Sequence, residues 1–162
     1  MATTGYSGRQ IFLHWITAII IAIQFAYHDG MQLSWRLIRE GGEVPFSVPT
    51  AIHVALGIFI LLLSLPRLGL RLSRGAALPP ENESPGMARL AAITHAALYS
   101  LILLLPVSGL LAWFGKLGAA AVAHSILGKL LLLVVALHVL GALYQLIVLR
   151  SNVLWRMLRP RN

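Results

Sequence analysis

The chain contains no cysteine among its 162 residues. This absence excludes a disulfide framework, a thiolate metal site, an iron–sulfur cluster and a haem attached covalently through a CxxCH motif. Any metal chemistry must therefore depend on histidine, of which the chain has six.

Charged residues are also scarce, at 11% of the chain, whereas hydrophobic residues make up 58% and the mean hydropathy is +0.81. A soluble domain of this size does not need so much apolar surface to fill its core, so the composition predicts a polytopic membrane protein. Acidic residues number only five against 13 basic ones. The basic residues gather where apolar stretches end and are not interleaved with aromatic residues, which argues against nucleic acid as a partner.

Four apolar segments dominate the chain, and each is close to or longer than the roughly 20 residues that a spanning helix needs. The first carries His14, Trp15 and Gln24 and lacks a clear cleavage site, so we interpret it as a retained span and not as a signal peptide. The prediction is an all-α integral membrane protein, a single domain over residues 1–162, surrounded by membrane lipid. Its antiparallel bundle of four transmembrane helices is expected at about 10–29, 51–72, 88–114 and 119–149.

The connections between these segments differ in character. Residues 30–50 contain glycine, proline and several charges, and we expect a short surface helix there around Trp35 and Ile38. Residues 73–85 are rich in proline, glycine, glutamate and asparagine and are typical of a loop. The third connection, near 116–118, is very short, so the third and fourth helices should form a tight antiparallel hairpin.

Lysine and arginine are distributed unequally between the two sides of the predicted bundle. The positive-inside rule places the more basic side in the cytoplasm. That rule predicts that both termini are cytoplasmic in a bacterial inner membrane. The nine basic residues on the side of the termini are Arg9, Arg67, Arg71, Arg74, Arg89, Arg150, Arg156, Arg159 and Arg161, and the four on the other side are Arg36, Arg39, Lys116 and Lys129.

All six histidines lie within or at the edges of the apolar segments, where an ionisable residue is costly and usually functional. His124 and His138 are 14 residues apart, which is roughly 21 Å along a helix and about 40° in azimuth. One helix face therefore presents imidazoles at two membrane depths. The predicted orientation gives a cytoplasmic layer of His14, His95 and His138 and an opposite layer of His28, His53 and His124.

Two layers of histidine match the needs of two b-type haems. A b haem takes two axial imidazoles from facing helices of a bundle, so two stacked haems need four histidines. The porphyrin edge also needs space beside each ligand, at the residue one helical turn on. Four histidines have a small residue at that position and are the candidate ligands: His14 with Ala18, His53 with Gly57, His124 with Gly128 and His138 with Ala142.

Other roles for these histidines stay open at this point. A single intramembrane histidine often bonds only to a neighbouring helix. Zinc is a weaker alternative, because it prefers a closed tetrahedral set, usually with cysteine or carboxylate, and the sequence has no HExxH motif or carboxylate cluster. A proton relay or transporter typically has internal repeats, broken helices and acidic residues in mid-span, and none of the acids here lies in mid-span.

Three further residues are candidates for the vicinity of a substrate or quinone. His95 belongs to the cytoplasmic layer and is expected either to touch a haem propionate or quinone or to be incidental. Lys129 lies inside the fourth span and either snorkels outward or neutralises a propionate or attracts an anion. His28, beside Asp29, is interpreted as an interfacial residue, with contact to substrate or haem as the alternative.

Several short motifs follow one another in a specific order and spacing. The motifs are the pair His14–Trp15, the run Ile-His-Val-x-x-Gly from Ile52 to Gly57, the pair Arg67 and Arg71, the HxxxY…LPxxGL stretch from His95 to Leu110, and His124 with His138. In this order they make the chain resemble the bacterial di-haem cytochrome b561 family over nearly its whole length.

The resemblance implies a four-helix bundle that encloses two non-covalent b haems. It implies His14 and His138 as ligands of the cytoplasmic-side haem iron, and His53 and His124 as ligands of the periplasmic-side iron. His95 matches a family histidine that is not an axial ligand, whereas we identify no family counterpart for His28 or Lys129.

The resemblance also implies a function. Members of the family move electrons across the membrane to or from quinone. One branch is similar to a superoxide oxidase, which takes electrons from superoxide at the periplasmic face and reduces ubiquinone. The alternative is an electron-transfer subunit that links the quinone pool to a partner dehydrogenase, hydrogenase or periplasmic carrier.

Overall fold

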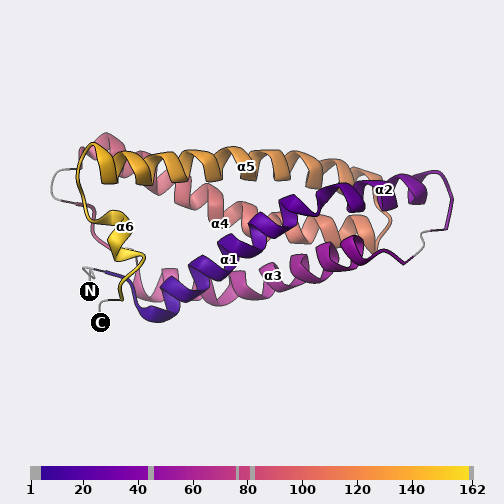
Figure 1. Ribbon diagram of the computed structural model, residues 1–162, viewed down its shortest axis with the longest axis horizontal. Coiled ribbons are helices and arrows are strands. Elements are labelled where there is room, and N and C mark those ends of the chain that lie inside the picture. Colours follow the sequence, from indigo (N-terminus) through magenta and orange to yellow (C-terminus); the bar gives the residue numbers. More distant parts are fainter. Residues whose placement is uncertain (1–4, 44–45, 76, 81–82, 161–162) are drawn as a thin grey trace.

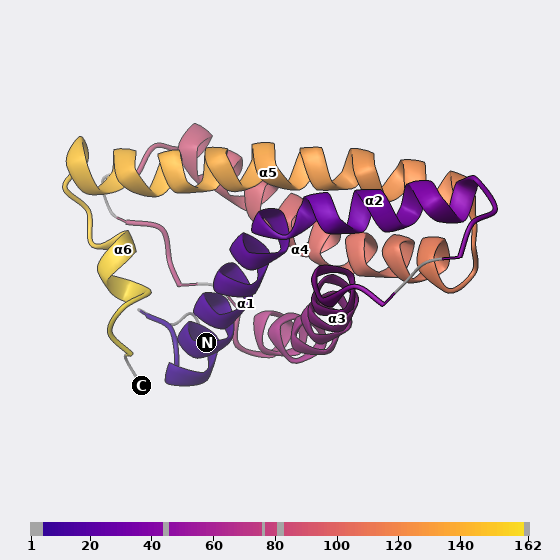
Figure 2. The ribbon, with the colours of Figure 1, turned by 45° about the vertical axis from the view of Figure 1, so that its right-hand side comes forward.

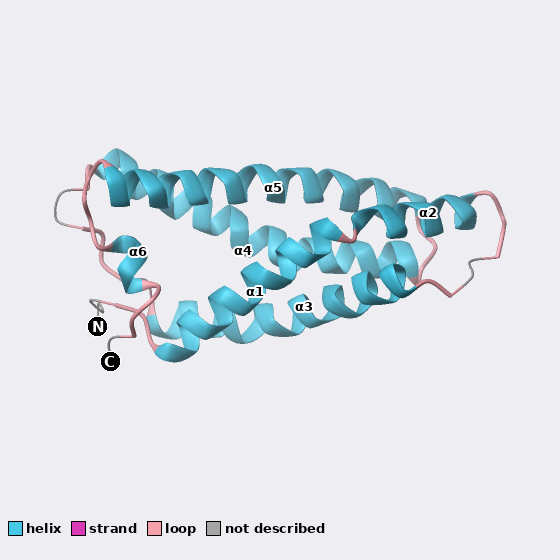
Figure 3. Cartoon of the chain, in the orientation of Figure 1, coloured by secondary structure: helices cyan, strands magenta, loops and turns pink. Residues whose placement is uncertain are grey.

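The computed structural model describes residues 5–43, 46–75, 77–80 and 83–160, and these residues form helices and no strand (Figures 1 and 3). Two short helices, α2 (His28–Arg39) and α6 (Val153–Arg156), accompany the long ones. The predicted all-α membrane architecture with four spans is confirmed. The four helices long and apolar enough to cross a membrane are α1 (Gly8–Ala26), α3 (Val48–Arg74), α4 (Pro85–Trp113) and α5 (Gly118–Ile147).

The long helices pair in a chain, α1 with α3, α3 with α4 and α4 with α5 (Figure 2). The pair α4 and α5 has the most extensive contact and forms the expected tight hairpin. Its turn needs a left-handed backbone at Lys116, where φ is 54°. Both termini lie at the same end of the bundle, beside α6 (Figure 1).

The first span is shorter than expected at its far end. It begins with a capping box between Ser7 and Gln10 and ends at Ala26, because Tyr27 leaves the helical conformation (φ −102°, ψ 17°). His28 therefore starts a separate amphipathic helix, α2, instead of ending the span. The short surface helix expected around Trp35 and Ile38 is present, and it begins earlier, at His28.

Helix α2 is attached to the start of α3 by close backbone approach and one buried hydrogen bond. The hydroxyls of Ser34 and Thr50 lie 2.7 Å apart, and both side chains are buried. A Cβ added to Gly30 would lie 2.6 Å from the Cβ of Pro49, so only glycine allows this approach. The contact fixes α2 along one end of the bundle.

A small apolar core separates the two histidine depths. Leu131 of α5, 3% exposed, packs with Leu101 and Ile102 of α4. Leu131 is seven residues from both His124 and His138, so it lies on the same helix face between them. Most other leucines of α5 point outward, as expected for a helix that faces lipid.

A proline in α4 exposes a carbonyl group that α3 then satisfies. Pro106 has no N–H to donate to the carbonyl of Ile102. The hydroxyl of Ser64, which is 0% exposed, lies 3.3 Å from that oxygen and 2.7 Å from the carbonyl oxygen of Ile60. The hydrogen bond ties α3 to α4 at the middle of the bundle.

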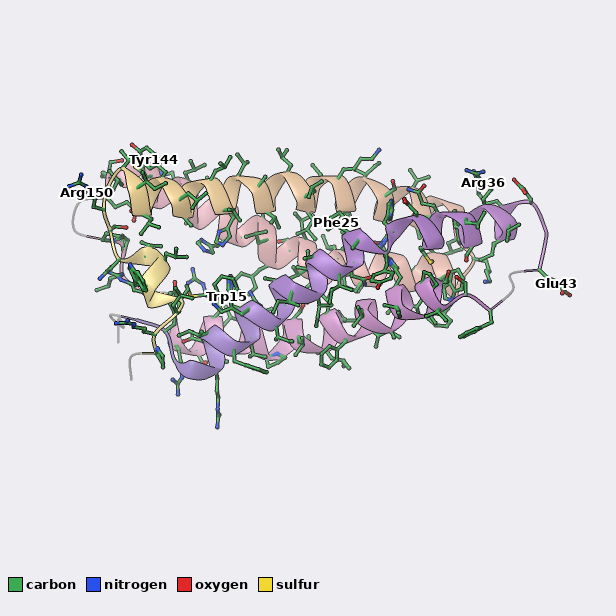
Figure 4. All side chains as sticks on the ribbon, viewed as in Figure 1. Trp15, Phe25, Arg36, Glu43, Tyr144 and Arg150 are labelled. Atoms are coloured by element: carbon green, nitrogen blue, oxygen red, sulfur yellow. The ribbon has the colours of Figure 1, made fainter. Side chains whose placement is uncertain are left out.

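The C-terminal segment folds back across the end of the bundle, which the sequence patterns did not predict. After α5 ends, α6 packs against it, and the indole N–H of Trp15 donates to the carbonyl of Met157 at 2.8 Å. Arg156 donates to the carbonyl of Leu78 at 2.6 Å. Figure 4 shows Trp15 of α1 beside α6 at this end.

Candidate functional site

The four candidate ligands face one another in two pairs, and α5 contributes to both. His14 of α1 faces His138 of α5, with the ring centroids 6.1 Å apart. His53 of α3 faces His124 of α5, again with the centroids 6.1 Å apart. We call the first pair the terminal pair, because it lies toward the chain termini, and the second the distal pair.

The separation within each pair suits an iron atom between two imidazoles. A metal–nitrogen bond to imidazole is about 2 Å long, and a ring nitrogen lies about 1 Å from its ring centroid, so two imidazoles on one iron have centroids about 6 Å apart. Two neutral imidazoles from facing helices are also the donor set of a b haem. The geometry and chemistry of both pairs therefore fit this cofactor.

His124 of the distal pair is held by α4. Its Nδ1 donates to the carbonyl of Leu105 at 2.8 Å, and the hydroxyl of Ser108 lies 3.3 Å from the same nitrogen. Because a carbonyl oxygen only accepts, Nδ1 carries the proton and Nε2 is left for a metal. A Cβ added to Gly109 would lie 2.9 Å from Cε1 of His124, so this glycine makes room for the ring.

His53, the other distal ligand candidate, is anchored through its backbone. Its carbonyl accepts a hydrogen bond from Nε2 of Gln24 at 2.9 Å, and its ring Nδ1 is buried without a partner among the described residues. Gly57, the small residue one turn from His53, partly faces Gln24. A Cβ added to Gly57 would lie 3.5 Å from the amide nitrogen of Gln24. At Gly128, by contrast, an added Cβ would meet no atom within 4 Å.

The terminal pair is supported by an arginine. Arg67 of α3 donates through Nη1 to the carbonyl of Leu13, next to His14, at 2.6 Å. Its guanidinium lies 5.8 Å from the centre of the Tyr99 ring, and its Nε is buried without a partner among the described residues. The positive-inside rule explains arginines at this end as anchors at the membrane surface, but the side chain of Arg67 points into the bundle.

His95 of α4 adds a third imidazole at the terminal end. Its ring centroid is 5.2 Å from that of His138, and the two planes are close to perpendicular, at 80°. Its Nδ1 lies 2.6 Å from the carbonyl oxygen of Ala91, one turn earlier in the same helix. The structure therefore brings His95 into contact with the terminal pair, as its predicted layer indicates.

Among the described residues, His28 and Lys129 make no ring contact or hydrogen bond with these histidines, although His28 lies near enough to His53 and His124 to interact electrostatically with both. His28 lies on exposed α2 and accepts a hydrogen bond from the amide of Gln32 at 2.6 Å. Lys129 is exposed, about 140° around α5 from His124. The outward position of Lys129 agrees with snorkelling.

The end of the bundle away from the termini carries an open hollow with two cationic side chains. Arg39 of α2 and Lys116 of the hairpin turn line it, together with apolar and glycine residues. Figure 4 shows Arg36 and Glu43 at this end and Arg150 at the opposite end. The residues that line the hollow are Trp35, Ile38, Arg39, Gly41, Gly42, Lys116 and Gly118.

Comparison with known proteins identifies the family of the chain. A model of the family described as prokaryotic cytochrome b561 matches residues 5–160. The chain belongs to this family. Family membership identifies it as a haem-b protein of transmembrane electron transfer, and its four spans fit a bacterial inner membrane.

Three known bacterial proteins are similar to the chain. Cytochrome b562 of Cereibacter sphaeroides is 34% identical, with 97% of each chain covered. A probable superoxide oxidase CybB of Yersinia pestis is 26% identical, also with 97% of each chain covered. Cytochrome b561 homolog 1 of Escherichia coli is 32% identical over 68% of this chain and 61% of the relative.

The sequence contains a signal for the position of Arg67. Arg67 follows His53 by 14 residues, the same spacing as His124 to His138. This spacing places Arg67 on the His53 face of α3, one histidine layer further along. For Gln24 and Ser108 no comparable signal exists, since their roles depend on contacts between different helices.

Proposed function

We propose that the chain binds two b haems, one between His14 and His138 and one between His53 and His124. The observation that carries the proposal is the equal separation of 6.1 Å between the ring centroids of both pairs. When bound, a b haem supplies one-electron iron redox chemistry. Two such centres at two depths give the electron a route across the membrane.

The surrounding residues prepare the ligands and keep water out. Leu105 fixes the proton of His124 on Nδ1, so that Nε2 faces the metal position. Gln24 and Arg67 tie α1 to α3 beside the distal and terminal pairs. Leu131 and its α4 neighbours fill the space between the pairs with apolar side chains, which lowers the local dielectric constant.

We further propose that the electrons come from superoxide and reduce ubiquinone. Superoxide is a small anion, and Arg39 and Lys116 give the hollow at the end away from the termini a positive lining, next to exposed Arg36. Two superoxide anions each give up one electron and leave as oxygen, and one quinone takes up two electrons and two protons. The relative from Yersinia pestis with the name of probable superoxide oxidase supports this activity.

The activity requires that the cationic hollow faces the periplasm. We propose this orientation, with both termini in the cytoplasm, because nine basic residues lie on the side of the termini and four on the other. A reporter that is active only in the cytoplasm, fused to the C-terminus, should be active. An inactive cytoplasmic reporter together with an active periplasmic one would reverse the orientation.

The second candidate function is an electron-transfer subunit between the quinone pool and a partner dehydrogenase, hydrogenase or periplasmic carrier. One observation favours it: the relative at 34% identity carries only the name of a cytochrome. In this case the hollow would be a contact for a redox protein and not a trap for a small anion.

The class of cofactor is tested by a reduced-minus-oxidised spectrum of the purified protein. We expect a b-type band with two haems per chain by pyridine haemochrome assay. A colourless protein after expression with haem supplementation would refute the haem assignment, and one haem per chain would refute the double site.

The electron donor is tested with superoxide and a soluble ubiquinone analogue. We expect superoxide loss that depends on quinone and exceeds the spontaneous rate. The double variant Arg39→Gln/Lys116→Gln should lower this rate roughly tenfold at low salt and less at high salt, since steering by charge is screened. Arg89→Gln, an exposed arginine at the opposite end, is the matched control. No quinone-dependent loss in the wild type would favour the subunit function.

A further inference from the structure

The three contacts between histidine rings at the candidate site fall into two classes of distance. The two ligand pairs have centroids 6.1 Å apart, whereas His95 and His138 are 5.2 Å apart. A hydrogen bond between two ring nitrogens is about 3 Å long, so two imidazoles joined by one have centroids about 5 Å apart. The shorter separation therefore suits a direct hydrogen bond between the rings and not an intervening iron.

The contact of His95 with its own helix determines which nitrogen it can offer. Its Nδ1 lies 2.6 Å from the carbonyl oxygen of Ala91. A carbonyl oxygen has no proton to give, so the Nδ1 of His95 must donate. In a neutral imidazole the other nitrogen, Nε2, is then an acceptor. His95 thus presents a hydrogen-bond acceptor at the terminal pair.

His138 has the complementary requirement when it binds iron. One of its nitrogens is then bound to the metal, and the other carries a proton that needs an acceptor. Among the described residues, no hydrogen bond to the ring of His138 is formed by backbone carbonyls or other side chains. His95, whose ring is in contact with it, is the acceptor that the structure provides.

We propose that His95 is a positioning residue for the terminal haem, and that its Nε2 accepts a hydrogen bond from the free ring N–H of His138. The inference rests on the proposed ligation of iron by His138. The hydrogen bond would form once iron bound to His138 holds that ring in place. His95 therefore acts on the haem through its ligand, not as a ligand itself.

The same helix performs the same task for the distal pair. Helix α4 supplies the carbonyl of Leu105 to the Nδ1 of His124 at 2.8 Å. Both ligands contributed by α5 thus receive their acceptor from α4, which contributes no ligand. The close pairing of α4 and α5 then has a functional reason, since it orients one imidazole at each depth.

The hydrogen bond has an electronic consequence. An acceptor on the outer N–H makes an axial imidazole more basic, which stabilises oxidised iron and lowers the reduction potential. His95→Leu should therefore raise the midpoint potential of the terminal haem and leave the distal haem unchanged. His95→Gln keeps an acceptor oxygen, so its terminal midpoint should lie between those of the wild type and His95→Leu.

The experiment is a potentiometric titration of the purified two-haem protein, followed by optical spectra and by low-temperature electron paramagnetic resonance of the oxidised haems. His28→Leu is the matched control for the terminal haem, because it removes an imidazole that lies near the distal pair only and should leave the terminal midpoint unchanged. We expect an altered resonance of the terminal haem alone in His95→Leu. His138→Ala, which should remove that haem, identifies its signal.

Unchanged midpoint and resonance in His95→Leu, with slower quinone reduction, would overturn the proposal and make His95 a quinone contact. His95→Phe keeps the ring volume without the acceptor and replaces the leucine variant if that variant does not assemble. Loss of the terminal haem in both variants but retention in His95→Gln supports the proposal, whereas loss in all three contradicts it. A wild type without two haems, or a terminal haem retained in His138→Ala, would refute the proposed ligation instead.

Discussion

The terminal and distal pairs share one ring separation but differ in their electrostatic surroundings. Around the distal pair the supporting groups are neutral: the carbonyl of Leu105, the hydroxyl of Ser108 and the amide of Gln24. Around the terminal pair they include the guanidinium of Arg67 and a third imidazole, His95. Equal ligand geometry is thus combined with unequal charge.

This difference teaches how one bundle can give direction to electron flow. Reduction of a haem iron removes one unit of positive charge, so a neighbouring cation favours the reduced state. Arg67 donates to the carbonyl of Leu13, the residue before His14. Its charge should therefore raise the reduction potential of the terminal haem relative to that of the distal haem. Under the proposed ligation electrons would run from the distal haem to the terminal haem, which agrees with the proposed donor at the end away from the termini.

The largest effect is expected from removing the ligands pair by pair. His53→Ala or His124→Ala should remove the distal haem and spare the terminal one, and His14→Ala or His138→Ala should do the reverse. The haem content per chain should fall by about half in each case, because each iron needs two imidazoles. Pyridine haemochrome assay and difference spectra measure this. Loss of both haems from one distal variant would mean that the pairs are not independent.

The next largest effect is expected from a substitution that disturbs the packing around His124 and so affects the distal pair alone. Gly109→Ala places a methyl group where only 2.9 Å separates it from Cε1 of His124, so the ring must move or α4 must shift. We expect lower occupancy of the distal haem and a loss of roughly 1–3 kcal/mol in stability, as for other overpacked sites. Gly69→Ala, where an added Cβ meets no atom within 4 Å, is the control. Full distal occupancy in Gly109→Ala would show that the glycine is not required.

The charge difference between the pairs is tested with Arg67→Leu. Loss of the cation should lower the midpoint potential of the terminal haem, opposite in sign to His95→Leu, and leave the distal midpoint unchanged. Loss of the charged hydrogen bond to Leu13 should also cost about 1.5–3 kcal/mol in stability. Arg74→Leu, an exposed arginine of the same helix, should change neither quantity. A midpoint in Arg67→Leu equal to that of the wild type would remove the proposed cause of directional flow.

The smallest effect concerns the hydrogen bond from Ser64 that joins α3 to α4 at the middle of the bundle. Ser64→Ala removes the donor near the carbonyl of Ile102, and the stability should fall by about 1 kcal/mol while both haems are retained. Thermal release of haem in detergent measures the change. Ser100→Ala, on the exposed face of α4, should have no effect. Selective loss of one haem in Ser64→Ala would mean that this serine supports one pair only.

The spans were predictable from the sequence because lipid imposes a simple rule of length and apolarity on each helix separately. The spacing of His124 and His138 likewise depends only on the geometry of one helix. The break at Tyr27, which assigns His28 to α2, was not predictable, because no proline or glycine marks it. The return of α6 to Trp15 depends on a contact between residues far apart in the chain.

The support of the ligands is the part that the sequence does not reveal directly. The stretch with Leu105 and Gly109 is recognisable as a motif, but its role in holding His124 requires the register between α4 and α5. At Gly57 the sequence pattern was ambiguous, because a small residue one turn from a candidate ligand can make room for a neighbouring side chain, here Gln24, as well as for a porphyrin. For Arg67 the helix face was predictable from its spacing of 14 residues from His53, but its hydrogen bond to Leu13 was not.

The placement of two candidate ligands on α5 constrains how this gene can change length. One residue inserted between His124 and His138 would turn the second ring by about 100° away from its partner, and no adjustment of a loop could compensate. Insertions in the connection between α2 and α3 leave every ring contact in register. Variation in length among related chains should therefore concentrate in such connections, while the distance of 14 residues in α5 stays fixed.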